Sequence, residues 1–170
     1  MSWIVFYGLA KSRLLTHLVV PSVEDETISL TYKGVASCEV VRVTDALATM
    51  EEMANGQGIL RPAPFDIVFV DADKTRLLEY VESCLSSDRV LKKGGMIVVD
   101  NVLWKGLVLE AGTGDFSRVD KESEDEERKR RRARKLATKM HLFNSEIVKD
   151  NRVEVVVLPM RDGLSVIRKR

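Results

Sequence analysis

Two short apolar runs in the middle of the chain each end abruptly in acidic or polar residues. Phe65–Val70 leads into Asp71, and Met96–Val99 leads into Asp100 and Asn101. Near-continuous runs of Val, Ile and Phe of this length are typical of strands that are buried on both faces of a parallel sheet. We therefore predict two neighbouring parallel strands, whose carboxyl ends lie at one edge of the sheet, where ligands bind in α/β folds.

The segment between these runs has the spacing of an amphipathic helix. Leu77, Val81 and Leu85 recur every four residues, and acidic residues occupy the other face. We predict a crossover helix over Thr75–Ser86, followed by a glycine turn at 92–95 that leads into the second strand.

Similar patterns predict elements nearer the two ends of the chain. On the N-terminal side we expect strands at Trp3–Tyr7 and Thr27–Tyr32, with a loop at Val20–Glu26. On the C-terminal side, an apolar stripe predicts a helix that packs on the sheet through Leu136, Met140, Phe143 and Ile147. The last expected elements are two strands that form an antiparallel pair, Val153–Pro159 and Leu164–Arg168.

An acidic block passes directly into a basic block between residues 120 and 135. Glu124 and Arg128 begin a series of acid-before-base pairs four residues apart, the favourable orientation on a helix. We interpret the segment as a solvated helix. The alternative is a localisation signal or RNA-binding patch at Arg128–Arg134, but the neighbouring acids cancel much of its field and no aromatic residues interleave with it.

Composition sets limits on the class of protein. The chain has 170 residues with 45% hydrophobic and 31% charged residues, which suits one soluble domain over 1–170 with a real core. A net charge of +1 gives no general attraction to nucleic acid or membrane, so we expect neither as a partner. The two cysteines, Cys38 and Cys84, form no disulfide framework and fit a reducing, cytoplasmic compartment. A homodimer remains an open option.

The motifs around the two central strands resemble a known family. VDADK at Val70–Lys74, followed by GGMIVVDNVLWKG at Gly94–Gly106, is similar to cation-dependent O-methyltransferases of the caffeoyl-CoA and catechol O-methyltransferase type. These enzymes use S-adenosylmethionine. The stretch from Phe143 to Leu164 resembles the closing helix and strand pair of the same family, so the resemblance runs from about Lys33 to Arg170. It implies an α/β fold with a Rossmann-like, mostly parallel methyltransferase sheet and a C-terminal antiparallel strand pair.

The candidate catalytic chemistry centres on oxygen ligands. Asp71, Asp100 and Asn101 are hard donors suited to a divalent cation such as Mg²⁺, Mn²⁺ or Ca²⁺, and they match the metal ligands of the family. Such a cation would bind two neighbouring hydroxyls of an aromatic acceptor and hold one oxygen in line with the methyl donor. Lys74 is then a candidate general base beside Asp71, because a desolvated lysine near a cation loses its proton more readily. A solvated lysine is the plainer alternative.

Other positions take roles only through the resemblance. Asp73 and Ala46 match positions that contact the methyl donor, and Trp104 and Lys105 lie where the family contacts its substrate, Lys105 replacing a common asparagine. Two of them have a structural alternative: Asp73 suits a turn or a helix N-cap, and Trp104 suits the edge of a core.

Residues 1–32 do not resemble the family. No glycine-rich turn between a predicted strand and a helix is evident, although this turn normally lets the donor approach the backbone. We therefore expect a fold that is incomplete at its N-terminus. The leading function is S-adenosylmethionine-dependent methyl transfer to a hydroxyl of a catechol-like or caffeoyl-CoA-type acceptor. The alternative is a non-catalytic remnant that binds a ligand or a partner.

Overall fold

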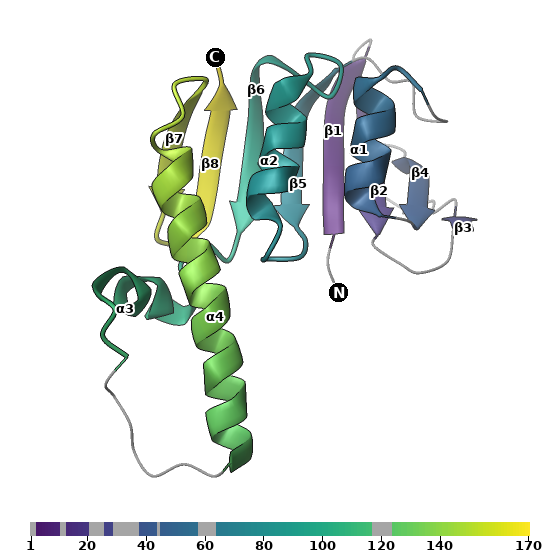
Figure 1. The fold of residues 1–170 in the computed structure, drawn as a ribbon. Helices are drawn as coiled ribbons and strands as arrows, with labels where there is room; N and C mark the ends of the chain where they lie inside the picture. The colour runs from purple at the N-terminus through teal and green to yellow at the C-terminus, as the bar shows by residue number, and fades with distance from the viewer. Residues whose placement is uncertain are drawn as a thin grey trace.

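The computed structural model describes residues 3–10, 13–20, 26–28, 38–43, 45–57, 64–116 and 124–170 (Figure 1). Eight strands form one sheet in the order β3-β4-β2-β1-β5-β6-β8-β7. They are β1 Trp3–Ala10, β2 Arg13–Val20, β3 Glu26–Ile28, β4 Cys38–Val43, β5 Phe65–Asp71, β6 Leu91–Asp100, β7 Val153–Leu158 and β8 Leu164–Lys169. The helices are α1 Ala46–Ala54, α2 Leu77–Ser86, the 3₁₀ helix η1 Trp104–Gly106, α3 Leu107–Thr113 and α4 Glu124–Ile147.

The two central strands pair as predicted. β5 and β6 are parallel, and Val70 lies opposite Val99. Both valines are fully buried, so the next residue of each strand, Asp71 and Asp100, emerges at the same edge of the sheet. The expected turn at 92–95 lies instead within β6, where the pairing shifts register between Phe65 and Ile67 of β5.

Helices α1, α2 and α4 lie on one face of the sheet (Figure 1). The crossover helix is confirmed, although α2 begins at Leu77 rather than Thr75, because Thr75 belongs to a turn that Asp73 closes. The opposite face is less covered: Phe69, Val98 and Val166 are half-buried neighbours across three strands. None of the helices within the described ranges is long and apolar enough to cross a membrane.

The N-terminal strands enter the sheet in a way that the sequence did not indicate. The strand expected at Trp3–Tyr7 is confirmed and continues to Ala10, pairing antiparallel with both β5 and β2. β2 and β4 were not predicted, and they form the second parallel pair. The expected strand at Thr27–Tyr32 overlaps β3 only over its first two residues, and 29–32 lie outside the described residues. Most of the loop expected at Val20–Glu26 also lies outside them.

The C-terminal elements follow the prediction closely. β7 and β8 form an antiparallel pair, and β8 also pairs antiparallel with β6. Of the expected apolar stripe on α4, Met140, Phe143 and Ile147 are buried, whereas Leu136 is half-buried and Ala137 takes its place in the core. The α/β class and the terminal antiparallel pair are thus confirmed, and antiparallel pairing extends further because β1 runs opposite to β5.

A buried lysine closes the amino edge of the central strands. Lys169 is 6% exposed, and its Nζ donates to the carbonyl oxygens of Leu91 at 3.0 Å and Cys84 at 3.4 Å. The same ammonium pairs with Asp88 at 2.9 Å. Burial raises the pKa of the Cys84 thiol to about 12, which keeps it protonated and unreactive at neutral pH.

The charged segment is the first half of a continuous helix of 24 residues. Glu124 to Lys129 are exposed, and Arg128 pairs with Asp125 at 2.9 Å with i,i+3 spacing. This half of α4 extends past the edge at which β5 and β6 end (Figure 1). The expectation of a solvated helix is consistent with this exposure.

Reversing two exposed charges on this helix, Arg131→Glu with Arg132→Glu, should therefore change the free energy of unfolding by less than about 1 kcal/mol. Denaturant titration of the wild type and the double variant measures this difference. A salt-sensitive RNA affinity that the wild type shows and the double variant loses would establish the RNA-binding alternative instead.

Candidate active site

Lys74 brings the ends of the two central strands together. Its Nζ donates to Asp71 Oδ1 at 2.8 Å and to the carbonyl oxygen of Asp100 at 3.1 Å. The Lys74 side chain is only 11% exposed and that of Asp71 is 32% exposed. The contact spans 26 residues of sequence, and it places one positive charge between the two strand ends.

The backbone turns sharply immediately after β6. Asp100 Oδ1 accepts a hydrogen bond from the Asn101 N–H at 2.7 Å, and Asn101 adopts a left-handed conformation with φ of 64°. Both residues are half-buried. Asp71, Lys74, Asp100 and Asn101 therefore lie at one edge, as the sequence predicted from two separate strands.

The side chains at this edge include oxygen donors of the type that divalent cations bind. No group of three or more His, Cys, Asp and Glu side chains within the described ranges could hold a metal ion. A site here would depend on two carboxylates, Asp71 and Asp100, with the amide oxygen of Asn101 completing a set of hard donors. The Lys74 ammonium lies against oxygens of both strand ends.

Asp73 has a local structural role. Its Oδ1 accepts hydrogen bonds from the Thr75 N–H and hydroxyl, each at 2.9 Å, in the turn that precedes α2. The side chain is exposed. This geometry matches the turn-forming alternative, while contact with a methyl donor stays a prediction.

Ala46 begins α1 and is buried, with 2% of its surface exposed. The preceding residue, Asp45, caps the helix, because its Oδ1 accepts from Leu47 N at 2.8 Å and Ala48 N at 3.3 Å. Partial burial acts to raise the pKa of Asp45, but hydrogen bonds from these amides and from Arg76 outweigh it and lower the pKa. Arg76 Nη1 reaches Asp45 Oδ2 at 3.3 Å and so links α1 to the start of α2. Sequence reasoning missed this link, although an acidic residue before a helical run is an N-cap signal.

Trp104 and Lys105 lie in the loop that follows the acidic edge. The Trp104 indole N–H donates to the Ala133 carbonyl of α4 at 3.1 Å, and the ring is half-buried. The Lys105 side chain is exposed. Trp104 therefore joins this loop to α4, and substrate contact by either residue stays a prediction.

Two adjoining grooves lie between the start of α2 and the middle of α4. One, of about 250 Å³, is lined by Lys74 and by residues that include Leu78, Lys139 and Leu142. The other, of about 520 Å³, shares Lys139 and Leu142 and adds Lys135. Leucines and lysines thus line both grooves, and the first of them includes Lys74.

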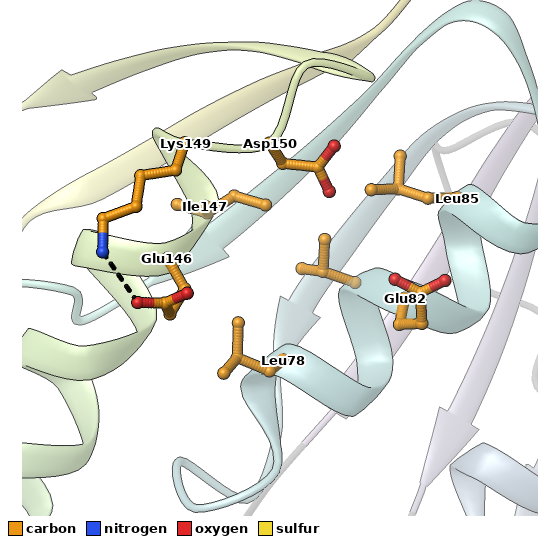
Figure 2. A pocket seen from close by; sticks show the side chains of 8 residues that line it. Leu78, Glu82, Leu85, Glu146, Ile147, Lys149 and Asp150 are labelled. Carbon is orange, nitrogen blue, oxygen red and sulfur yellow. Dashed lines mark hydrogen bonds and ion pairs between the residues drawn. The ribbon is translucent and has the colours of Figure 1, made fainter.

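A third groove, of about 390 Å³, lies between α2 and the C-terminal end of α4 (Figure 2). Its lining includes Leu78, Leu85 and Ile147, and Lys149 on its rim pairs with Glu146 at 2.9 Å. It contains none of the predicted site residues, so we do not associate it with the acidic edge.

Comparison with known proteins defines the family. The family model for O-methyltransferases matches residues 24–170, and the chain therefore belongs to the O-methyltransferase family. Tricin synthase 1 of Oryza sativa subsp. japonica is 34% identical over 119 residues, which are 70% of this chain and 39% of that protein. Catechol O-methyltransferase domain-containing protein 1 of Mus musculus is 32% identical over 130 residues, 76% of this chain and 40% of that protein.

A solved structure shares the fold of this chain. The crystal structure of the SAH-bound methyltransferase PaMTH1 of Podospora anserina superposes with a TM-score of 0.59 and 24% identity. The superposition covers 76% of this chain and 48% of that one. This chain thus spans about two fifths of the curated relatives named above and about half of the solved neighbour.

Proposed function

We propose that the chain carries the metal-assisted half of an O-methyltransferase site, and that it transfers a methyl group from S-adenosylmethionine to an aromatic hydroxyl. The observation that supports this most is the position of Lys74, with its Nζ 2.8 Å from Asp71 Oδ1 and 3.1 Å from the Asp100 carbonyl. Family membership supports the reaction class.

The chemistry assigns a separate task to each residue. Asp71, Asp100 and Asn101 would hold Mg²⁺ or Mn²⁺, which when bound supplies a positive charge that orients two neighbouring hydroxyls and makes one more acidic. Lys74, once deprotonated, accepts the hydroxyl proton at Nζ. The acceptor oxygen then forms its bond to the methyl carbon as the carbon–sulfur bond of the donor breaks.

The grooves next to Lys74 support an acceptor of the caffeoyl-CoA type over a small uncharged catechol. Leu136 and Leu142 give an apolar surface for a ring or chain, and Lys135 and Lys139, which also line the grooves, suit negative charge. Both acceptor classes remain within the proposal, and binding measurements with each would separate them.

One observation favours a second candidate, a non-catalytic binding module. Strands β1 and β2 pair directly, with Ala10 opposite Arg13, where a methyltransferase sheet needs a strand, a glycine turn and a helix for the donor. A chain with this arrangement would keep the acidic edge and lack much of the donor site.

Replacement of Lys74 by alanine should lower the rate of Mg²⁺-dependent methylation by about 10²–10⁴-fold, because the proton acceptor is lost. The assay is a single turnover with excess chain, millimolar S-adenosylmethionine and either catechol or caffeoyl-CoA. Lys149→Ala, which removes an exposed lysine on the third groove, is the matched control and should keep the wild-type rate.

A wild-type chain that binds Mg²⁺ and acceptor but transfers no methyl group at any donor concentration would establish the binding module. Equal rates in the wild type and Lys74→Ala would remove Lys74 from the mechanism.

A further inference from the structure

The turn between β7 and β8, residues 159–163, contacts the loop of residues 101–106, which follows β6 and contains η1. The Leu103 N–H donates to the Asp162 carbonyl at 2.8 Å, and the Val102 N–H donates to the Gly163 carbonyl at 3.2 Å. The Lys105 N–H donates to the Asp162 carboxylate Oδ1. Three backbone amides of the loop are thus bound by two adjacent residues of the turn.

The loop that these bonds hold has a strained backbone. Asn101, Trp104 and Lys105 have positive φ angles of 64°, 46° and 56°. Such conformations are unfavourable for residues other than glycine and persist only where the surroundings enforce them. The first of these residues, Asn101, is also the candidate amide ligand at the acidic edge, so whatever holds the loop also sets the position of that amide.

The approach of the turn to the loop is unusually close. Gly163 has φ of 85°, and a Cβ there would lie 2.9 Å from both the Cβ and the backbone nitrogen of Leu103. From the other side, Asn144 of α4 donates through Nδ2 to the Val102 carbonyl at 2.8 Å. The loop is therefore held between the turn and α4, and Asp162 contributes a carboxylate to the contacts on the side of the turn.

We infer that Asp162 is a positioning residue for the cation site, an inference that rests on the proposed function. Its carbonyl and carboxylate bind the Leu103 and Lys105 amides and fix the left-handed turn that begins at Asn101. Asp162 acts through this backbone and needs no contact with the cation. Residues that orient ligands in this way commonly change metal affinity by about 10–100-fold when they are replaced.

The test is Mn²⁺ affinity measured by calorimetry on the full chain. Asp162→Ala should weaken Mn²⁺ binding by about tenfold or more. Asp162→Asn keeps an oxygen acceptor for the Lys105 amide and should stay within about threefold of the wild type. The matched control is Asp150→Ala, which removes another half-buried carboxylate, one that lies before β7, at the opposite end of that strand, and binds Arg152; it should leave the Mn²⁺ affinity unchanged.

Hydrogen exchange without metal gives an independent readout. The Lys105 amide, whose acceptor is the Asp162 carboxylate, should exchange faster in Asp162→Ala than in the wild type, and Asp162→Asn should restore most of the protection. The Leu103 amide keeps its acceptor, the backbone carbonyl of residue 162, in every variant and serves as the internal reference. Asp162→Glu, which keeps the charge and displaces the carboxylate by one methylene, replaces the alanine variant if that variant does not fold.

The two possible failures give different results. Failure of the wild type to bind Mn²⁺ would overturn the cation site and, with it, this role for Asp162. Mn²⁺ binding by the wild type with unchanged affinity in Asp162→Ala would overturn the positioning role and leave the cation site intact.

Discussion

Replacing Asp100 with alanine should abolish the stabilisation of the chain by Mn²⁺. Asp100 ends β6 beside Asp71, and it provides one of the two carboxylates at the edge. At a Mn²⁺ concentration of about 100 times Kd, binding should add about 2.7 kcal/mol to the stability of the wild type. For a chain of this length this corresponds to a rise in Tm of roughly 5–11 °C, measured by thermal unfolding with and without Mn²⁺.

Asp73→Ala is the control for this measurement. Asp73 carries the same charge and lies two residues after Asp71, but its carboxylate is exposed and occupied by the Thr75 turn. It should keep the Mn²⁺-induced rise in Tm. Equal rises in the wild type and Asp100→Ala would place any bound cation elsewhere on the chain.

The chain should bind S-adenosylmethionine two to four decades more weakly than caffeoyl-CoA O-methyltransferase 1 of Zea mays, a longer relative that is 34% identical over 105 residues. In Rossmann-like folds the nucleotide ligand contacts backbone amides at a glycine turn and an acidic residue at the end of a neighbouring strand, and the methyl donor would need the same contacts. The antiparallel pairing of β1 with β2 and β5 leaves no strand–turn–helix unit within the described residues between 3 and 20. Loss of one charge-assisted hydrogen bond and several backbone ones costs about 3–5 kcal/mol.

Calorimetric titration of both proteins under the same conditions, with Mg²⁺ present, measures this difference in Kd. The titration should be repeated with Ala46→Trp, in which a bulky side chain at a buried position predicted to contact the donor should weaken any remaining affinity. A wild-type Kd within tenfold of that of the maize enzyme would mean that β1 and β2 build a complete donor pocket in another way.

Much of the candidate site can be predicted from the amino-acid sequence, because it depends on local patterns. Two apolar runs that end in Asp71 and Asp100 can form buried strands only if their acidic residues emerge at the strand ends. The helix between them requires a parallel crossover, so both acids are expected at one edge. The parallel β5–β6 pair and the Lys74 contacts confirm that expectation.

The place of β1 in the sheet is harder to predict, because one of its two partners, β5, is far away in sequence. β1 lies beside β5 in the sheet. β4 comes directly before β5 in the chain, but the two strands are not neighbours in the sheet. The direction of such a strand depends on its nonlocal hydrogen bonds and on how its surface is covered, and alternating apolar residues are compatible with either direction.

Hydrophobic periodicity and strand ends are local properties, so the sequence alone specifies the α/β class, the parallel central pair, the antiparallel strands at the end and the group of acids. Nonlocal packing is needed to set β1 antiparallel to β5, to bring Asp45 to Arg76 and to let Asp162 hold the loop after Asn101. Asp162 and Lys105 are separated by 57 residues. The hydrogen bond between them arises because the β7–β8 turn packs against the loop that follows β6. No local sequence pattern predicts this contact.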